Sequence, residues 1–139
     1  MSIYKPCDIR GNAAAELSPQ LYRNWGRHLG RAVAGKGPLV VGGDVRGSTP
    51  KFLEALTVGL IEANAQVISL GQLPTPMVYF AKRHFQAAGC AIVTASHNPA
   101  PINGLKWMLG DRPPTEQDVQ ALGDDAEQGV AVELSERTP

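Results

Sequence analysis

The chain is 139 residues long and carries 13 Lys and Arg against 13 Asp and Glu residues, so its formal net charge at pH 7 is zero. Hydrophobic residues make up 43% and charged residues 19%, as is typical of a soluble domain with its own core. Cys7 and Cys90 lack the CxxC spacing of a zinc or redox site, which fits a reducing compartment, and Cys90 is expected in the core. Without a signal pattern or an apolar run of ~20 residues, we expect a cytoplasmic protein that does not contact membranes.

The charge is unevenly distributed along the chain. Residues 1–110 carry eleven Lys and Arg against five Asp and Glu, whereas residues 111–139 carry two against eight. A basic body suits an anionic ligand such as a sugar phosphate. The spacing of Arg23, Arg27 and Arg31 is also explained by a solvated helix face. Because no aromatic interleaving or nucleic-acid motif accompanies the charge, we expect no nucleic-acid partner.

Helical and strand patterns alternate along most of the chain. Three helices are predicted from apolar residues at helical spacing, and they begin at Ser18-Pro19, Thr49-Pro50 and Thr75-Pro76. Buried strands are predicted between them, at residues 39–41, 66–70 and 90–93. Gly35 is expected to stop the first helix. In the third helix Met77, Phe80 and Ala81 are expected to face inward.

The C-terminal part adds one strand and one helix to this pattern. Asn103-Gly104 is a turn signal, so residues 105–109 are expected to pair back as an antiparallel edge strand. Thr115, with Asp118 three residues later, predicts a last helix that runs to about Gln128. Together the elements predict a single α/β layer-sandwich domain over residues 1–139, with a mostly parallel four-stranded sheet plus an antiparallel edge strand. Ligands of such sheets bind beyond the carboxyl ends of the strands.

One sequence run carries more information than any other. It places a hydroxyl, an imidazole and an amide side chain directly after the predicted strand 90–93, in Thr94-Ala95-Ser96-His97-Asn98-Pro99. Three further motifs share its polar character, and they are Asn103-Gly104-Leu105-Lys106, Asp8-Ile9-Arg10-Gly11 and Gly43-Asp44-Val45-Arg46-Gly47-Ser48. Because the loops at residues 42–49 and 94–104 both follow strands, we expect them to share one edge of the sheet.

These motifs resemble those of the alpha-D-phosphohexomutases, in their phosphomannomutase/phosphoglucomutase branch, over about residues 4–128. The serine of that family's TASHNP or TGSHNP loop is phosphorylated in the working enzyme, and Ser96 is the matching position. The family's YDIRG and GRDxRxS elements are matched with Cys7 in place of Tyr and Gly43 in place of Arg. The resemblance implies domain I of a mutase that interconverts hexose 1-phosphate and hexose 6-phosphate. Hexose 1,6-bisphosphate is then the intermediate and activator.

The resemblance also implies roles for the motif residues. Ser96 is expected to carry the phosphoryl group, and its phosphate to supply one ligand to Mg²⁺. Lys106 and Arg10 are expected to bind phosphate groups and to neutralise charge during transfer. His97 adjoins the nucleophile and is a further catalytic candidate, as a donor to the phosphate or as a proton shuttle. Which of His97, Lys106 and Arg10 is the general base stays open.

Other motif residues are expected to shape or support the site. Asn98 is a candidate for substrate binding, and Asn98-Pro99 is expected to shape the serine-containing loop. Asp44 and Arg46 are expected to orient this loop from a neighbouring turn, and a purely structural Asp-Arg pair is the alternative. His28 and His84 are interpreted as surface or packed residues, and Trp107 as a sheet-packing residue rather than a platform for a sugar.

The resemblance also shows what these residues lack. The family builds its active site from four domains, and the DxDxD metal loop, the sugar-recognition loop and the terminal phosphate-binding loop do not occur in this sequence. We therefore expect an N-terminal domain of a longer mutase, inactive without domains II–IV of the same polypeptide. The Cys7-Asp8-Ile9-Arg10-Gly11 run favours mannose and glucose phosphates, with phosphoglucosamine mutase as the nearest alternative.

Two function classes outside the mutases are the alternatives. A Ser-His hydrolase needs a nucleophile elbow such as GxSxG, which Ala95-Ser96-His97 does not provide. A non-catalytic module that binds phosphosugars or serves assembly is the stronger alternative, because the chain is short. That alternative predicts that Ser96→Ala leaves biological function intact, whereas a mutase would lose it.

Overall fold

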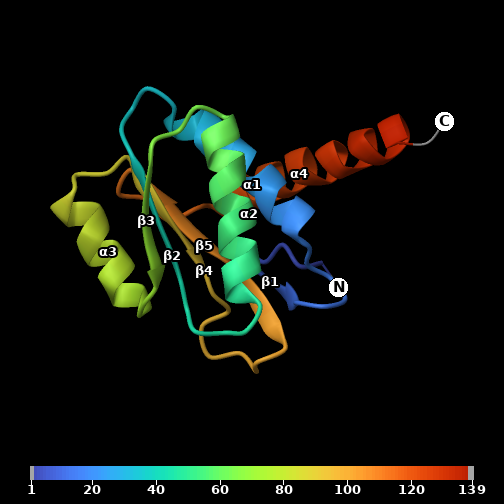
Figure 1. Cartoon of the computed structure of the whole chain (residues 1–139), viewed down its shortest axis with the longest axis horizontal. Coiled ribbons are helices and arrows are strands. Elements are labelled where there is room, and N and C mark those ends of the chain that lie inside the picture. Colours follow the sequence, from blue (N-terminus) through green and yellow to red (C-terminus); the bar gives the residue numbers. More distant parts are fainter. Residues whose placement is uncertain (1, 138–139) are drawn as a thin grey trace.

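The computed structural model describes residues 2–137 and forms an α/β sandwich (Figure 1). The elements in chain order are β1 (Ile9–Asn12), α1 (Pro19–Val33), β2 (Leu39–Gly43), α2 (Thr49–Glu62), β3 (Val67–Gln72), α3 (Thr75–His84), β4 (Gly89–Val93), β5 (Ile102–Leu109) and α4 (Glu116–Arg137). Within this range, no helix is both long enough and apolar enough to span a membrane. The predicted alternation of helices and strands is confirmed.

The sheet has five strands in the order β1-β5-β4-β2-β3. β2 pairs in parallel with β3 and with β4, whereas β5 runs antiparallel to β4, and β1 antiparallel to β5. The mostly parallel core and the antiparallel addition are therefore confirmed. The prediction that residues 105–109 form an edge strand is wrong, because β1 pairs along the outer side of β5. β1 was missed because its four residues, which include Arg10 and Gly11, carry little strand signal.

Asn103 and Gly104 do not form the predicted turn but lie within β5. A Cβ atom on Gly104 would overlap the carbonyl of Ile9, so glycine permits the close approach of β1 rather than a reversal of the chain. The Asn103 side chain is fully buried and bonded to neighbouring groups, as described below. Both residues therefore serve strand packing, which a dipeptide turn signal does not distinguish.

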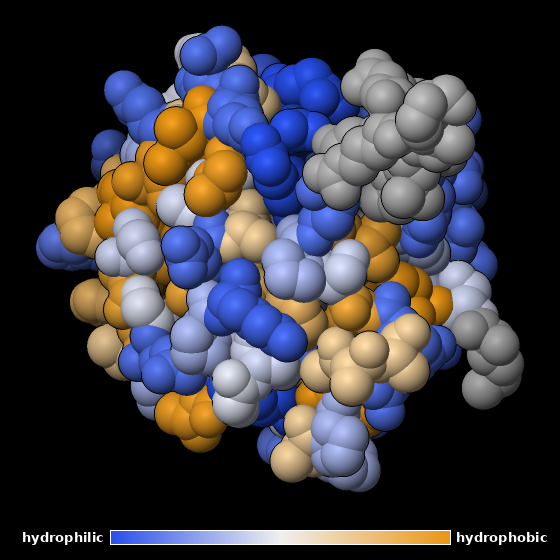
Figure 2. All heavy atoms as spheres, turned by 45° about the vertical axis from the view of Figure 1, so that its right-hand side comes forward, coloured by the Kyte–Doolittle hydropathy of each residue, from blue (hydrophilic) through white to orange (hydrophobic). Residues whose placement is uncertain are grey.

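Helices cover both faces of the sheet. α1, α2 and α4 lie on one side and α3 on the other, as Figure 1 shows. The larger core is built around aromatic and aliphatic side chains that include Tyr22, Trp25, Phe52, Val41 and Leu105. The smaller core, beneath α3, consists of Val40, Val78, Ala81, Cys90 and Ile92. Cys90 is fully buried, as expected. The outer surface is mixed, with hydrophobic patches among hydrophilic side chains in Figure 2.

The inward face of α3 differs from the prediction. Ala81 is buried as expected, but Met77 and Phe80 are 48% and 55% exposed, and Val78 takes the inward position. Every residue from Met77 to Ala81 is apolar or aromatic, so periodicity alone does not select the buried stripe. A Cβ on Gly42 of β2 would lie 2.9 Å from Val78 Cγ2, so α3 approaches the sheet closely there and small side chains fit best.

The predicted starts at Ser18 and Thr115 agree with observed side-chain caps, whereas α2 and α3 begin at Thr49 and Thr75 without a side-chain cap. Ser18 Oγ accepts a hydrogen bond of 3.2 Å from the amide of Leu21. At the start of α4, the amide of Asp118 donates to Thr115 Oγ1 at 3.1 Å and the amide of Thr115 donates to Asp118 Oδ2 at 2.9 Å. α4 continues to Arg137, beyond the predicted end near Gln128.

The arginine stripe of α1 is paired rather than simply solvated. Arg23 and Arg27 contact the carboxylate of Glu62 in α2, and Arg31 contacts Asp125 in α4. His28 Nδ1 also lies 2.7 Å from Asp125 Oδ2. The stripe therefore ties α1 to both neighbouring helices, and its side chains remain partly exposed.

Candidate active site at the serine loop

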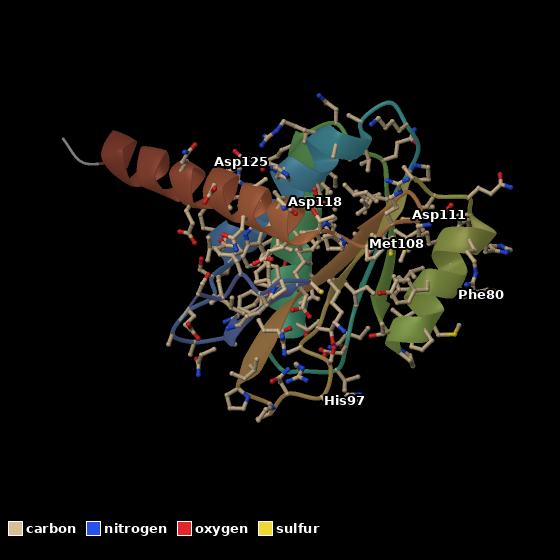
Figure 3. All side chains as sticks on the ribbon, turned by 180° about the vertical axis from the view of Figure 1, so that it is seen from behind. Phe80, His97, Met108, Asp111, Asp118 and Asp125 are labelled. Carbon is tan, nitrogen blue, oxygen red and sulfur yellow. The ribbon has the colours of Figure 1, made fainter. Side chains whose placement is uncertain are left out.

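The serine loop, residues 94–101, joins the carboxyl end of β4 to β5. Thr94 is buried at its base, whereas Ser96 and His97 are exposed. Ser96 has φ +58°, in the left-handed region that costs a residue with a Cβ about 1 kcal/mol or more. Its amide donates to Thr94 Oγ1 at 3.0 Å, which helps to hold this conformation. The strained serine is therefore displayed at the end of the sheet, near the tip that His97 marks in Figure 3.

Asp44, in the turn after β2, is the hub that holds this loop. Its Oδ1 accepts from Thr49 Oγ1 at 2.8 Å and from the amide of Arg46 at 3.2 Å. Its Oδ2 accepts from Thr94 Oγ1 at 2.8 Å and from Arg46 Nε at 2.9 Å. Burial raises the pKa of the Asp44 carboxyl, but the hydrogen bonds from Thr94, Thr49 and Arg46 outweigh burial and leave this pKa below its usual range. Asp44 is therefore an ionised anchor at neutral pH.

Arg46 clamps the main chain of the serine loop. Its Nη2 donates to the carbonyl of Ser96 at 2.8 Å, and its Nη1 donates to the carbonyls of Pro99 and Ile102 at 2.8 and 2.9 Å. The Arg46 side chain is only 11% exposed. The fork of a guanidinium suits such multiple contacts, and its use here leaves little capacity to bind an external phosphate. Asp44 and Arg46 lie beside the loop, as predicted. Their ion pair with each other belongs to the same network of hydrogen bonds that holds the loop.

Asn98 also bonds within the loop. Its Nδ2 donates to the carbonyl of Ala95 at 2.8 Å, and its amide donates to the same carbonyl at 3.1 Å. The side chain thus closes a turn around Ser96 and His97. A contact of Asn98 with substrate stays a prediction.

Three side chains that sequence reasoning missed complete the support, namely Thr94, Asn103 and Tyr22. Asn103 Nδ2 donates to Ser48 Oγ at 2.8 Å and to Thr49 Oγ1 at 3.1 Å. The hydroxyl of Tyr22 donates to the carbonyl of Gly104 at 2.8 Å. Thr94 belonged to the quoted motif but had no assigned role. Tyr22 carried no signal, because a tyrosine at an apolar helix position predicts only burial.

The two candidate cations lie on one face of the sheet. Leu105 in β5 and Ile9 in β1 point into the larger core, so Lys106 and Arg10 point to the opposite face. α3 packs chiefly on β2 and β4 and so covers only part of this face. Arg10 pairs in register with Gly104, two residues before Lys106, and therefore shares that face with Lys106.

The partners of the two cations differ. Arg10 Nε donates to Asp8 Oδ1 at 3.1 Å, and its side chain is 40% exposed. Lys106 is half-buried opposite Ile92 of β4, two residues before the serine loop begins. Within residues 2–137, no described side chain forms an ion pair with Lys106. Positive charge therefore lies beside the strand that delivers Ser96.

The described residues fit a divalent cation only in part. They contain no group of three or more His, Cys, Asp or Glu side chains placed to hold a metal ion. Asp44, the carboxylate that supports the loop, is occupied by Thr49, Thr94 and Arg46. A Mg²⁺ ion at Ser96 would thus take only phosphate oxygens from this part of the chain.

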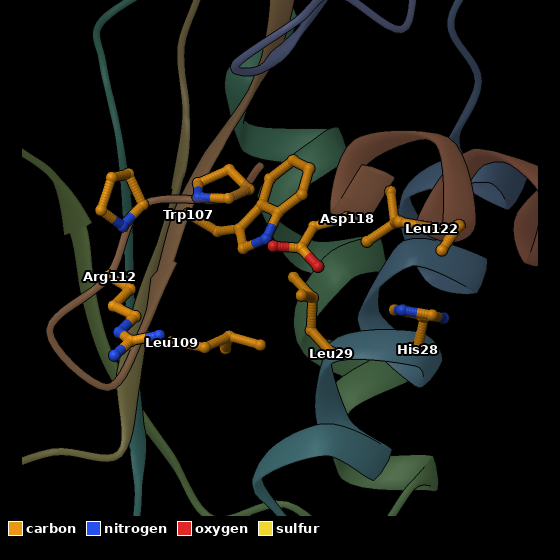
Figure 4. A pocket seen from close by; sticks show the side chains of 10 residues that line it. His28, Leu29, Trp107, Leu109, Arg112, Asp118 and Leu122 are labelled. Atoms are coloured by element: carbon orange, nitrogen blue, oxygen red, sulfur yellow. The ribbon is translucent and has the colours of Figure 1, made fainter. Parts of the chain in front are cut away.

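A separate hollow of about 240 Å³ lies between β5, α1 and α4 (Figure 4). Trp107 lines it from β5 and is 5% exposed, with its ring within the larger core. The sheet-packing interpretation of Trp107 is therefore confirmed. His28 and Asp118 also line the hollow, and His28 is partly buried against Asp125.

Known proteins share the sequence pattern of this chain. Residues 2–129 match the family model described as phosphoglucomutase/phosphomannomutase, alpha/beta/alpha domain I. The chain is 42% identical over 115 residues to the phosphohexose mutases of Xanthomonas campestris pv. campestris (strain B100), covering 83% of this chain and 25% of that protein. It is 43% identical over 103 residues to the phosphoglucosamine mutase of Parasynechococcus marenigrum (strain WH8102), covering 74% of this chain and 22% of that protein.

A solved structure supports the same assignment. The chain superposes with a TM-score of 0.83 and 32% identity on a phosphoglucomutase/phosphomannomutase family protein from Burkholderia thailandensis, covering 91% of this chain and 30% of that one. The chain thus spans between about a fifth and a third of the length of these relatives. The matched fold, motifs and family model show that the chain belongs to the phosphoglucomutase/phosphomannomutase family, as its alpha/beta/alpha domain I.

Proposed function

We propose that this chain is the phosphoserine domain of a hexose-phosphate mutase, with Ser96 as the residue that gives and receives the phosphoryl group. One observation carries the proposal. Ser96 is exposed in a left-handed conformation, and Thr94 and Arg46 form direct hydrogen bonds with its main chain. Asp44 in turn accepts hydrogen bonds from both Thr94 and Arg46. A purely structural serine has no need of such a support, whereas a nucleophile gains from a fixed position.

The proposed reaction consists of two phosphoryl transfers. In the first, the bond between phosphorus and the Ser96 oxygen breaks, and a bond to a hydroxyl of a hexose monophosphate forms. The sugar hydroxyl loses its proton to a base, and the serine oxygen regains one. In the second transfer, the other phosphate of the resulting hexose 1,6-bisphosphate returns to Ser96. The net result is the conversion of a 1-phosphate to a 6-phosphate, or the reverse.

Each candidate side chain has a role in this scheme. Arg10 and Lys106 share the sheet face beside β4, where their charges would bind substrate phosphate and oppose the negative charge of the transferred group. His97 is exposed next to Ser96 and is the nearest candidate in sequence for moving a proton. Asp44 and Arg46 act through the loop and are positioning residues.

Mg²⁺ would supply further neutralisation of the phosphate charge when it is bound. From this chain it would contact the phosphate on Ser96, and its other ligands would come from outside the described residues. We therefore propose that activity requires further domains of a longer polypeptide. Hexose phosphates, including mannose and glucose phosphates, are the proposed substrates.

Mass spectrometry of the protein isolated from its own cells tests the proposal. We expect a phosphate on Ser96, an added mass of about 80 Da, together with mutase activity that Ser96→Ala abolishes. Ser69→Ala, at an exposed position of β3, is the control that retains activity. An unmodified Ser96 and full biological function of Ser96→Ala would overturn the mutase assignment in favour of a binding or assembly module.

A further inference from the structure

A second pocket lies away from the serine loop, between α3 and the end of β5. It measures about 360 Å³ and is lined by Tyr79, Lys82, Arg83, Met108 and Asp111. Figure 3 shows Met108 and Asp111 beside α3, away from the tip that His97 marks. The cavity is therefore separate from the candidate active site, and its residues have no role in the proposed mutase reaction.

Lys82 is the unusual residue of this cavity. Its side chain is only 7% exposed, and burial of an ammonium is costly unless it is well paired. Among the residues that the structure describes, its one ion-pair partner is Asp111, at 3.1 Å from Nζ to Oδ1. The side chain of Asp111 is itself 100% exposed. An ammonium has three donors, so this contact leaves donor capacity toward the cavity.

The neighbouring groups add no second negative charge. Burial raises the pKa of the Cys90 thiol to about 11, although the positive charge of Lys82 opposes this rise, so the thiol is neutral at pH 7. Burial also raises the pKa of Tyr79, whose phenol stays protonated and able to donate. Arg83 adds a second cation to the lining. The C-terminal end of α3 contributes roughly half a negative charge. The positive charges of Lys82 and Arg83 together exceed this charge plus that of the Asp111 carboxylate.

The backbone of Asp111 is held independently of its side chain, so the carboxylate can move away from Lys82. It lies in the tight turn between Leu109 and Arg112, which is closed by backbone hydrogen bonds of 3.3 Å between those two residues. The amide of Gly110 further anchors the turn to the carbonyl of Ala88 at 2.7 Å. The turn thus does not depend on the Asp111 side chain.

We propose that this cavity binds a small oxyanion, a phosphate monoester or a carboxylate, through the ammonium of Lys82. The oxyanion displaces the Asp111 carboxylate and gains further donors from Tyr79 and Arg83. Arg46 at the serine loop offers no comparable site, because its guanidinium is already bonded to protein acceptors. The proposal rests on this cavity alone and is independent of the proposed mutase activity.

NMR titration of the full chain tests the proposal, with inorganic phosphate and acetate as separate probes at constant pH and ionic strength. We expect saturable shifts of the Lys82, Met108 and Asp111 signals with at least one probe. Lys82→Met, which replaces the ammonium with an apolar group of similar length, is expected to abolish them. Lys36→Met, at an exposed lysine in the turn after α1, is the matched control and is expected to keep them.

The two probes separate the possible ligands. Saturation by both assigns the cavity to oxyanions in general, saturation by phosphate alone to phosphate monoesters, and saturation by acetate alone to carboxylates. Failure of both probes to saturate, or equal shifts in Lys82→Met, overturns the proposal. Binding at the candidate active site is recognised separately, by shifts of Ser96 and His97 in the serine loop.

Asp111→Asn provides a second and independent test. Loss of the competing carboxylate is expected to tighten binding of the effective probe about tenfold, the scale of one charged hydrogen bond. The variant is also expected to have a lower melting temperature without the probe and to regain stability when it is added. If Asp111 serves only as a surface ion pair, the variant loses stability and the probe restores none, which overturns the proposal.

Discussion

Asp44 and Arg46 form an ion pair, and the hydrogen bond of 2.9 Å from Arg46 Nε to Asp44 Oδ2 fixes the guanidinium against the serine loop. The same guanidinium reaches the carbonyl of Ser96 at 2.8 Å, and the same carboxylate accepts from Thr94 at 2.8 Å. The two residues therefore hold both the base and the tip of the loop. Loss of either one should affect Ser96 without touching its hydroxyl.

Arg46→Lys is expected to lower the free energy of unfolding by about 1–3 kcal/mol, because one ammonium cannot reproduce the forked contacts to Asp44 and three carbonyls. Urea unfolding measures this change. In an active mutase, we expect kcat to fall with little change in KM, since Arg46 positions the loop and does not bind substrate. Arg31→Lys, at a side chain that is 57% exposed, should stay within ~0.5 kcal/mol. Equal effects of the two variants would contradict the clamp.

Asp44→Asn is expected to remove a pH-dependent part of the stability. The pKa of Asp44 in the folded protein lies below its ordinary value of 3.8, so the ionised carboxylate stabilises the fold fully above that value. This contribution is lost as the pH falls through the folded pKa. The stability difference between wild type and Asp44→Asn should therefore shrink in urea unfolding as the pH falls below 3.8 and through the folded pKa. A difference that stays constant over this range would show that Asp44 does not act through its charge.

Glu62→Gln offers a contrasting case at the surface. Hydrogen bonds from Arg23, and then from Arg27, lower the pKa of Glu62 from 4.5 to about 2, so its contribution is complete above pH 4.5 and is lost toward pH 2. Its side chain is 33% exposed, however, and solvent screens the interaction. We expect a loss of no more than about 1 kcal/mol at neutral pH, reduced further in 1 M salt. A larger loss that salt does not change would mean that the pair is effectively buried.

Gly59→Ala is expected to be among the most damaging single changes in the helices. A Cβ at Gly59 would overlap the carbonyl of Arg23, and a Cβ at Gly26 would overlap the carbonyl of Leu56, so α1 and α2 touch through their backbones. Alanine favours a helix by about 1 kcal/mol, but overpacking costs about 1–3 kcal/mol or more, so the steric cost prevails. Gly47→Ala has no atom within 4 Å of its Cβ and should be nearly neutral. Chemical denaturation of both variants measures the two changes in the free energy of unfolding.

The sequence predicted most of the fold because its patterns are local. Helix starts at Ser18 and Thr115 depend on side chains that cap neighbouring amides, and the structure contains both caps. Errors arose where tertiary contacts decide. β1 becomes a strand only because β5 offers it a partner, and α3 turns Val78 inward because of its close approach to Gly42.

The motifs of the candidate site could be predicted from the sequence, but the hydrogen bonds that connect them could not. Asp44 and Arg46 were expected near the loop, and they lie there. The link from Thr94 to Asp44 spans 50 residues, and the link from Asn103 to Ser48 spans 55, so no local pattern contains them. Only the three-dimensional structure reveals which polar side chains face one another.

The longest of these links provides the last prediction. The hydroxyl of fully buried Tyr22 donates to the carbonyl of Gly104, 82 residues away, and the same carbonyl accepts from the amide of Thr94 at 3.3 Å. Tyr22 thereby connects the aromatic core, where its ring lies 4.3 Å from that of Phe52, to the first residue of the serine loop.

Tyr22→Phe keeps the ring and removes only the donor. We expect a loss of about 1–2 kcal/mol in the free energy of unfolding, because the buried carbonyl retains its weaker bond from Thr94. Hydrogen exchange of the Thr94 amide should become faster by more than the global loss explains, since its acceptor is no longer fixed. Tyr79→Phe makes the same chemical change in α3, where no hydrogen bond of the hydroxyl to a described residue is found, and should leave that exchange unchanged. If both variants exchange alike, Tyr22 packs the core without holding the serine loop.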